Sequence, residues 1–380
     1  MKKVLTLLKK EPMLAVSLLA AAVSMILTPP DASLLSAIDW KTLATLFMML
    51  TVLEGFKKEN IFRPLIRFAG RMKTMAAMSF FLVFGVFFSS MFVTNDVSLI
   101  IFVPLTILLF RSGNRERNIL PVISMENIAA VRGSLLTPFG SPQNLFLFSK
   151  SGVSAFTFML HMLPLWVMSG LLLCVFIRFL YRKDPAESIS SPESELTGEW
   201  DPARKKNRVV YLALFAVILW TIVSRTALWP WVTAAVFLTV LLTDRETLVR
   251  TDYVLLLTFL CFFIFSASVS AHPAISGFLK NAVAEHEYLW GILLSQVISN
   301  VPAAIVLYPF TANLSGLLYG VDSAGLCTLI GSLASVINYR IYVREYPGNG
   351  RAFIRTFTLV SLAFFAIVVI PGWLLSAWRF

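Results

Sequence analysis

The sequence predicts an all-α, multi-spanning membrane protein built from two inverted repeats, each with a re-entrant hairpin and a broken transmembrane helix. Three observations carry this prediction: an apolar composition, an alternation of basic and uncharged segments, and short motifs that recur in the same order in both halves. The first indicates a lipid environment, the second predicts the orientation, and the third relates the two halves.

Hydrophobic residues make up 57% of the chain and charged residues only 14%, whereas soluble domains carry about 25% charged residues. Apolar runs such as 13–27, 209–223 and 254–269 approach the roughly 20 residues that a helix needs to cross a bilayer. The first run follows a basic start, as in a signal peptide, but no small-residue cleavage site follows it. We therefore expect it to be a retained first span.

The net charge of +11 is unevenly distributed. Basic residues gather in segments such as 57–73, 111–117 and 340–355, while stretches such as 311–323 carry none. This alternation is typical of the positive-inside rule, which places the N-terminus in the cytoplasm and the C-terminus outside, and needs no nucleic-acid partner. The three cysteines lie in separate apolar segments and indicate no disulfide or metal cluster. No cofactor is expected.

Matched motifs relate the two halves of the chain. The block Thr94-Asn95-Asp96-Val97 corresponds to Ser299-Asn300-Val301-Pro302, and a Pro and a Thr follow both blocks at identical distances. Further on, Thr137-Pro138-Phe139-Gly140-Ser141 corresponds to Thr328-Leu329-Ile330-Gly331-Ser332. Matched blocks in the same order indicate an internal duplication.

When membrane crossings are counted from a cytoplasmic N-terminus, the second copy is predicted to have the opposite orientation to the first. We expect about 9–10 spans plus two hairpins, because each apolar run can cross the bilayer once and both polar tips must turn back. The first repeat is predicted at 1–181 and the second at 209–380, joined by a cytoplasmic linker at 182–208. The predicted elements are spans at 12–28 and 40–56, a hairpin at 75–110, a broken helix at 119–149, and a span at 155–181; then spans at 209–224, 227–243 and 252–270, a hairpin at 286–312, a broken helix at 321–342, and a span at 353–378.

Helices that end inside a membrane leave about four unpaired backbone groups at each broken end. Such ends persist only where they line an enclosed cavity or meet a ligand. Asn, Thr and Ser at the tips can cap helix ends and can bind ions. Gly and Pro at 133–144, and Gly at 325–335, can interrupt the matching span of each half. The sequence therefore predicts a binding site where tips and breaks meet, although Gly and Pro also occur in membrane helices as simple kinks.

These motifs resemble the ion transporter superfamily, and within it the citrate-transporter-like and arsenical-permease/NhaD-type branches, which are related to the divalent anion:sodium symporters. The two tip blocks look like that family's paired Ser-Asn-Thr motifs. Residues 127–144 are similar to its first glycine-rich loop, and residues 328–332 are a reduced version of the second. The resemblance covers roughly 40–150 and 250–345, and it implies an elevator-type symporter or exchanger and suggests a homodimer.

The resemblance also implies which residues bind substrate and ions. Asn95, Asp96 and Ser141 are the candidate ligands of a sodium ion. Two departures put sodium stoichiometry and carboxylate selectivity in doubt: Asp96 and Val301 replace hydroxyl residues, and the second loop lacks a Pro-Pro-Asn ending. The candidate substrate and ion site comprises Thr94, Asn95, Asp96, Arg132, Thr137, Gly140, Ser141, Asn144, Ser299, Asn300, Thr328, Gly331 and Ser332.

Three charged residues fall inside predicted membrane segments, where an ionised side chain costs at least about 2.5–3.5 kcal/mol. Asp96 is expected to bind a proton or cation; alternatively it caps a half-helix or pairs with Arg132. Arg132 either holds an anionic substrate with two hydrogen bonds or is that structural partner. Glu126 is expected to be a buried or interfacial structural partner.

The predicted function is secondary active transport of a small anion, a carboxylate or an inorganic oxyanion, coupled to Na⁺ or H⁺ across the cytoplasmic (inner) membrane. The alternatives are a cation/proton antiporter in which Asp96 exchanges protons, and an anion channel. No enzyme is expected, because the chain has no paired membrane aspartates, zinc motif or GxxxxGK[ST] loop.

Overall fold

The computed structural model describes residues 12–28, 32–59, 61, 72–183 and 205–379, and these residues form helices without any β-strand. The all-α prediction is therefore confirmed for the described chain. The predicted linker 182–208 and basic loop 57–73 lie largely outside the described residues. The helices of the first half are α2 (Pro12–Leu27), α3 (Ala32–Ala37), α4 (Trp40–Lys58), α6 (Met75–Val93), α7 (Asn95–Ser112), η1 (Glu116–Asn118), α8 (Ile119–Gly133), α9 (Pro142–Ser151) and α10 (Ala155–Leu180).

The second half repeats this order with additional helices. Short α13 and α15 stand beside the long helices and were not predicted, nor was α3 in the first half. The helices are α11 (Lys205–Val223), α12 (Trp229–Thr243), α13 (Arg245–Arg250), α14 (Tyr253–Ala271), α15 (Pro273–Val283), α16 (Glu287–Ile298), α17 (Asn300–Leu307), η3 (Tyr308–Phe310), α18 (Leu314–Ala324), α19 (Leu333–Glu345) and α20 (Gly350–Ser376).

Local sequence signals explain where several of these helices begin. Asp39 accepts a hydrogen bond from the backbone N of Thr42 and so caps α4, and Asp252 caps α14 in the same way. Thr74 and Ser154 cap α6 and α10. The element boundaries therefore follow from capping residues as well as from hydrophobicity.

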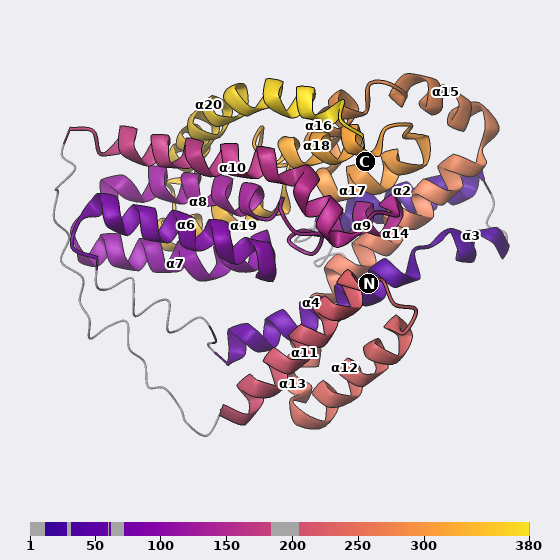
Figure 1. The fold of residues 1–380 in the computed structure, drawn as a ribbon, viewed down its shortest axis with the longest axis horizontal. Coiled ribbons are helices and arrows are strands. Elements are labelled where there is room, and N and C mark those ends of the chain that lie inside the picture. Colours follow the sequence, from indigo (N-terminus) through magenta and orange to yellow (C-terminus); the bar gives the residue numbers. More distant parts are fainter. Residues whose placement is uncertain (1–11, 29–31, 60, 62–71, 184–204, 380) are drawn as a thin grey trace.

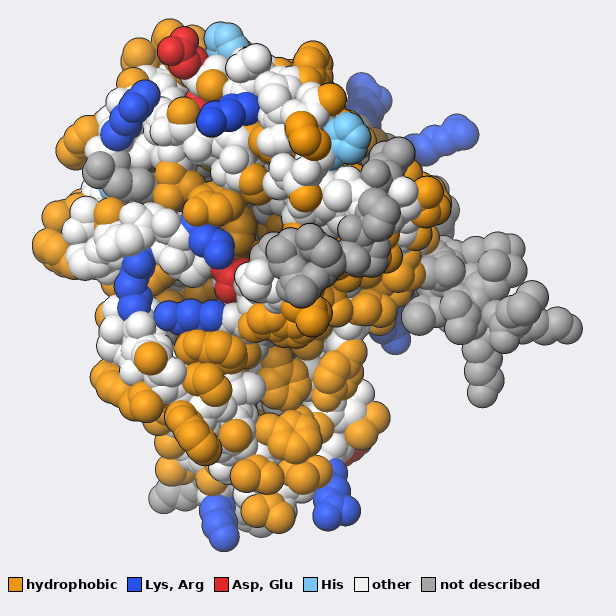
Figure 2. Space-filling model, turned by 90° about the vertical axis from the view of Figure 1, so that its right-hand side faces the viewer, with side chains coloured by type: hydrophobic (Ala, Val, Ile, Leu, Met, Phe, Trp, Pro, Cys, Tyr) orange, Lys and Arg blue, Asp and Glu red, His pale blue; other side chains and the backbone are white. Residues whose placement is uncertain are grey.

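Six helices are long and apolar enough to cross a membrane: α6, α7, α10, α11, α14 and α20. α2 and α12 are apolar but shorter, and α4 carries Lys41, Glu54, Lys57 and Lys58 within its 19 residues. Figure 2 shows one end of the molecule, where hydrophobic side chains cover much of the surface. Apolar side chains such as Ile26 (79% exposed), Leu242 (79%) and Val297 (71%) lie on the surface of the described chain. They are expected to contact lipid, because soluble proteins rarely expose large apolar patches.

The two hairpins differ in size. α6 and α7 have 19 and 18 residues, whereas α16 and α17 have only 12 and 8. At 1.5 Å per residue, the first hairpin is about 28 Å long and the second about 18 Å. Only the first hairpin therefore has arms that approach the thickness of a bilayer core.

Helices from the two halves of the sequence are packed together. Figure 1 shows α6, α7, α8 and α10 side by side at one end of the long axis, with α15 and α16 toward the other end. α19 packs on α7 while α9 packs on α17, and α2 packs on α14 while α4 packs on α12. Each half thus places its own elements against those of the other half. The inverted relation of the repeats, however, stays a prediction.

Candidate functional site

The first hairpin turns at a single residue, Thr94, between α6 and α7. Its φ of 70° and ψ of 157° lie in a region that only glycine adopts without strain. Asn95 follows, and its Oδ1 accepts a hydrogen bond from the backbone N of Asp96 at 2.9 Å. The Oδ1 atom of Asp96 is buried and has no hydrogen-bond partner among the described residues. Tip 1 (residues 94–96) therefore presents one carboxylate oxygen that is free to bind an ion.

The second hairpin makes the same turn at Ser299, between α16 and α17. Its φ is 71° and its ψ 158°, within a degree of the values at Thr94. The backbone N of Asn300 donates to Gly331 O at 3.2 Å, and the Nδ2 of Asn300 is buried without a partner in the described chain. Tip 2 (residues 299–301) thus shares the backbone of tip 1 but ends in the apolar Val301.

The first broken helix is interrupted at 134–141, between α8 and α9. Asn144 closes the break, because its Nδ2 donates to Ser134 O and Leu135 O, both at 3.3 Å. The hydroxyl of Thr137 donates to Met91 O near the end of α6. Break 1 (residues 134–141) is therefore tied by a hydrogen bond to the last turn of α6, which leads into tip 1.

The second broken helix is interrupted at 325–332, between α18 and α19. The hydroxyl of Thr328 donates to Gln296 Oε1 at 2.7 Å, and Gln296 Nε2 donates to Ala324 O at 3.1 Å. Together with the Asn300–Gly331 bond, this ties break 2 (residues 325–332) to tip 2.

Matched glycines permit both breaks. At Gly140 an added Cβ would overlap Ser134 O, and at Gly331 it would overlap Ala324 O. The residues that follow, Ser141 and Ser332, both have extended backbones and begin α9 and α19. The two breaks therefore have the same local construction.

A cavity of about 330 Å³ brings the two tips together. Asp96 of tip 1 and Ser299 and Val301 of tip 2 line it, with Asp252 and Arg340 contributing further charges. Thr94, Asn95 and Asn300 do not line this cavity, and neither do the predicted residues of break 1 or Arg132. The structure thus unites part of the predicted site around Asp96 and places the rest elsewhere.

Arg132 lies at the end of α8 and is fully buried (0% exposed). Its Nη1 donates a long hydrogen bond of 3.5 Å to the backbone O of Asp322. Its Nε and Nη2 are buried and have no partner among the described residues. No hydrogen bond or ion pair joins Arg132 to Asp96 in the described chain, so the alternative that pairs these two residues is not supported.

Asp322, at the end of α18, is a charged residue that the sequence reasoning missed. It is 1% exposed; its Oδ1 accepts from Gln143 Nε2 at 3.0 Å, while its Oδ2 has no partner in the described residues. An aspartate inside the apolar run before Gly325 was the signal that could have identified it. Gln143 and Gln296 were also missed, because an uncharged amide in a helix carries no such signal.

The predicted sodium ligands are only partly available. Asn95 Oδ1 is engaged by the Asp96 backbone, and Ser141 Oγ accepts from Asn144 N at 3.4 Å. Asp96 Oδ1 alone among the three ligating groups has no partner in the described chain. The described residues contain no group of three or more His, Cys, Asp or Glu side chains that could hold a metal. The sodium set stays a prediction.

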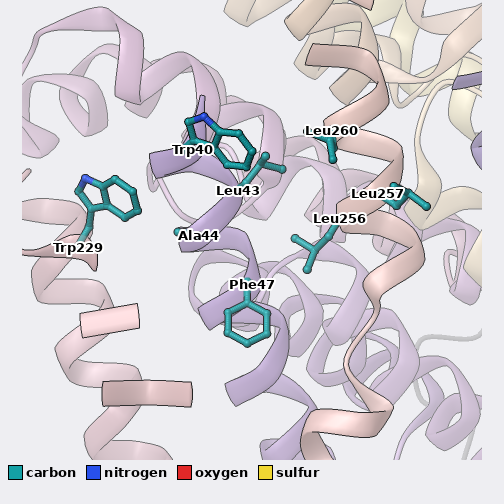
Figure 3. A pocket seen from close by; sticks show the side chains of 8 residues that line it. All are labelled: Trp40, Leu43, Ala44, Phe47, Trp229, Leu256, Leu257 and Leu260. Carbon is teal, nitrogen blue, oxygen red and sulfur yellow. The ribbon is translucent and has the colours of Figure 1, made fainter. Parts of the chain in front are cut away.

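A larger cavity of about 580 Å³ lies between α4, α12 and α14 (Figure 3). Its eight lining residues, which include Trp40 and Trp229, are all apolar. Because it offers no charge to an ion, this groove is not part of the candidate site.

Comparisons with known proteins agree with a membrane transporter. The family model described as "Citrate transporter" matches residues 4–322. The inner membrane protein YbiR of Escherichia coli is 33% identical over 90% of this chain and 88% of its own length. The uncharacterized transporter MJ0456 of Methanocaldococcus jannaschii is 29% identical over 85% of both chains. The crystal structure of the YdaH transporter of Alcanivorax borkumensis has a TM-score of 0.55 and 15% identity, covers 96% of both chains, and shows similarity of fold alone.

Proposed function

The chain belongs to the citrate transporter family, and we propose that it moves a small anion, a carboxylate or an inorganic oxyanion, together with Na⁺ or H⁺. The family consists of transporters, so the chain is a multi-pass membrane transporter rather than an enzyme. Its similarity to an inner membrane protein supports the inner membrane as its location.

The unpaired edge of Arg132 is the observation that carries this proposal. Nε and Nη2 lie on the same side of the guanidinium group, and this edge matches two oxygens of a carboxylate or oxyanion. A buried cation without hydrogen-bond partners costs several kcal/mol or more. An anionic ligand would remove this cost, so the empty edge favours an anion site.

Asp322 would be the alternative charge partner of Arg132, because its backbone already contacts the guanidinium group although its carboxylate makes no hydrogen bond to it in the described structure. Its carboxylate has one oxygen on Gln143 and one without a partner, and its backbone O already holds Nη1 of Arg132. A small movement of the Arg132 guanidinium group would let it pair either with the Asp322 carboxylate or with a bound anion. Because α8 and α18 belong to different halves of the chain, anion binding would bias their relative position.

Asp96 supports the coupling to a cation. It lines the cavity between the two tips, and its Oδ1 has no partner in the described residues. The same observation also favours the second candidate, a cation/proton antiporter, in which Arg132 would be purely structural.

Charged loops support the orientation that the sequence predicts. Arg111 lies in the last turn of α7, and Arg115 and Arg117 follow that helix at the base of the first hairpin. Basic residues at such positions favour the cytoplasmic side. The proposal therefore keeps the N-terminus in the cytoplasm and the C-terminus outside. The homodimer stays a prediction.

Anion uptake into proteoliposomes tests the proposal. Citrate, smaller carboxylates, phosphate and arsenate would be supplied with and without a Na⁺ gradient and a pH gradient. Arg132→Gln should abolish uptake of the accepted anion, whereas the exposed Arg178→Gln should leave it unchanged. Asp322→Asn in the Arg132→Gln background restores charge balance and controls for misfolding. Normal anion uptake by Arg132→Gln would favour the antiporter instead.

A further inference from the structure

A second group of buried polar side chains lies where α7, α8 and α19 meet, apart from the tips and from Arg132. Glu126, Asn127 and Asn338 are its members, and each is 0% exposed. The three helices pack on one another in pairs. The sequence reasoning treated Glu126 as a structural partner and did not identify the two asparagines next to it.

Hydrogen bonds satisfy the donors of this group but not its acceptors. Thr106 on α7 donates to Glu126 Oε1. Asn127 Nδ2 donates to Ser335 Oγ at 3.0 Å, and Asn338 Nδ2 donates to Ile123 O at 2.7 Å. The oxygens that are left, Glu126 Oε2, Asn127 Oδ1 and Asn338 Oδ1, are buried and have no partner among the described residues.

Contacts with α8 bring these three side chains near one another. Glu126 and Asn127 are neighbours on α8, and side chains on an α-helix lean toward its N-terminus and cover the preceding turn. For these two residues that turn contains Ile123, and the amide nitrogen of Asn338 donates to the carbonyl of that same residue. The three side chains are therefore anchored at one turn of α8.

We infer that Glu126, Asn127 and Asn338 form a binding site for a sodium ion. Hard cations prefer carboxylate and amide oxygens as ligands. A proton on Glu126 would supply one hydrogen for three acceptors, whereas a metal ion can satisfy all three. A monovalent ion would balance the single carboxylate, while a divalent ion would leave a buried net charge, which is costly.

No charged side chain among the described residues takes the place of this ion. In the described part of the chain, the one hydrogen bond that Glu126 makes is the bond from Thr106, and no ion pair involves it. The charged or titratable residues on helices packed against α8 are Asp96 and Arg111 on α7, Tyr339, Arg340, Tyr342, Arg344 and Glu345 on α19, His161, Cys174 and Arg178 on α10, Arg351 and Arg355 on α20, and Glu116 and Arg117 on η1.

The site would connect cation binding to anion binding. Glu126 and Arg132 lie on the same helix, about 9 Å apart along its axis. An ion held by α8 and α19 would fix Asn338 against α8 and so position the helix that carries Arg132. This consequence rests on the proposed function, but binding of the ion itself does not.

Sodium binding to the purified full-length protein tests the inference without any anion. Melting temperature would be measured as Na⁺ replaces choline at constant ionic strength, in an Asp96→Asn background that removes the tip carboxylate. A saturable rise is expected, because a ligand that binds only the folded state stabilises it. Glu126→Gln should weaken the apparent Na⁺ affinity by about tenfold or more, since it removes a charged ligand. Glu116→Gln, an exposed carboxylate change, should leave the response unchanged.

Asn338→Ala is the second variant and should weaken the Na⁺ response in the same direction even if Glu126→Gln does not fold. An unchanged Na⁺ midpoint in both variants would overturn the inference. A response to pH alone that Glu126→Gln abolishes, with no response to Na⁺, would identify a proton site and would overturn it too. Because no anion is present, failure here leaves the role of Arg132 untouched, and failure of anion uptake leaves the sodium site untouched.

Discussion

The two hairpin tips have the same backbone but carry different chemistry. Thr94 and Ser299 adopt φ and ψ values that agree within a degree, in a region that is strained for any residue but glycine. Two residues further on, tip 1 carries Asp96 and tip 2 carries Val301. Both residues line the same cavity.

This difference indicates that the two halves share a backbone design but have different functional roles. An identical strained turn in two unrelated loops would be improbable, so it supports a duplication whose backbone was retained. Only tip 1 keeps an ionisable group at the cavity. Ion coupling is therefore expected to depend on the first half, while the second half contributes Asp322 to the surroundings of Arg132.

The largest expected effect is on transport, and it would distinguish the functions of the two tips. Asp96→Asn removes the ionisable group and should lower gradient-driven anion uptake by about 100-fold, near the upper range of coupling energies between sites. Val301→Thr has nearly the same shape and should change little. Uptake in proteoliposomes under a Na⁺ or pH gradient measures both. Equal losses in the two variants would show that the tips are functionally alike.

The breaks should behave alike, because their glycines have the same surroundings. Alanine at Gly140 would place a Cβ against the backbone carbonyl of Ser134, and alanine at Gly331 would place one against that of Ala324. Each substitution should destabilise the protein by about 1–3 kcal/mol, as overpacking does. Thermal melting of both variants in detergent checks this, with Gly277→Ala, which meets nothing, as the control. A loss at only one break would contradict their equivalence.

Replacing the strained turn residue of each tip by glycine should stabilise the protein, and by the same amount at both tips. The side chain of Thr94 makes no capping hydrogen bond, so glycine there removes strain of about 1–3 kcal/mol, offset by about 0.5–1 kcal/mol of backbone entropy. Thr94→Gly and Ser299→Gly should each raise the melting temperature by about 2–4 °C. If either variant melts lower than the wild type, the turn is not strained in solution.

The smallest effect concerns the matched capping residues Asp39 and Asp252. Burial raises the pKa of Asp39, but hydrogen bonds from Lys150 and the Thr42 backbone lower it further, so the net pKa lies below its ordinary value. Lys150 is 2.8 Å from Asp39, whereas Asp252 has no ion pair in the described chain. Because Asn also caps helices, Asp39→Asn keeps the cap and removes only the ion pair with Lys150. It should lower the free energy of unfolding by roughly 1 kcal/mol or less.

Acid should remove this contribution. A carboxylate whose folded pKa is lowered stabilises the protein above its unfolded pKa of about 3.9 and loses that stabilisation as the pH falls through the folded value. The melting temperatures of wild type and Asp39→Asn should therefore converge below about pH 4. Asp252→Asn breaks no ion pair in the described chain and should cost less than Asp39→Asn at neutral pH. An equal penalty at both positions would contradict the asymmetry.

The sequence predicted the tips and breaks because they depend on local signals. Polar residues at the end of an apolar run marked Thr94 and Ser299, while Gly and Pro marked residues 134–141 and Gly alone marked residues 325–332. The predicted second break helix began at 321, whereas α18 begins at Leu314, because apolar residues before a Gly do not mark a helix start. α3, α13 and α15 were missed since short helices show too few turns for a periodic pattern.

Contacts between distant segments could not be predicted in this way. The sequence left Arg132 with Asp96 or an anion as partner, and the structure places it against Asp322. Which helices pack together depends on the tertiary fold and not on the spacing within either helix. The same reason hid Asn338, whose importance depends on the turn of α8 that it contacts.

The central claim, that Arg132 binds the transported anion, is tested most directly by equilibrium exchange. Labelled and unlabelled anion would be placed on opposite sides of proteoliposomes with no ion gradient, so that exchange requires anion binding but no driving force. Exchange should be absent in Arg132→Gln and should persist in Asp96→Asn, in which only coupling is impaired. Exchange by Arg132→Gln at the wild-type rate would contradict the claim.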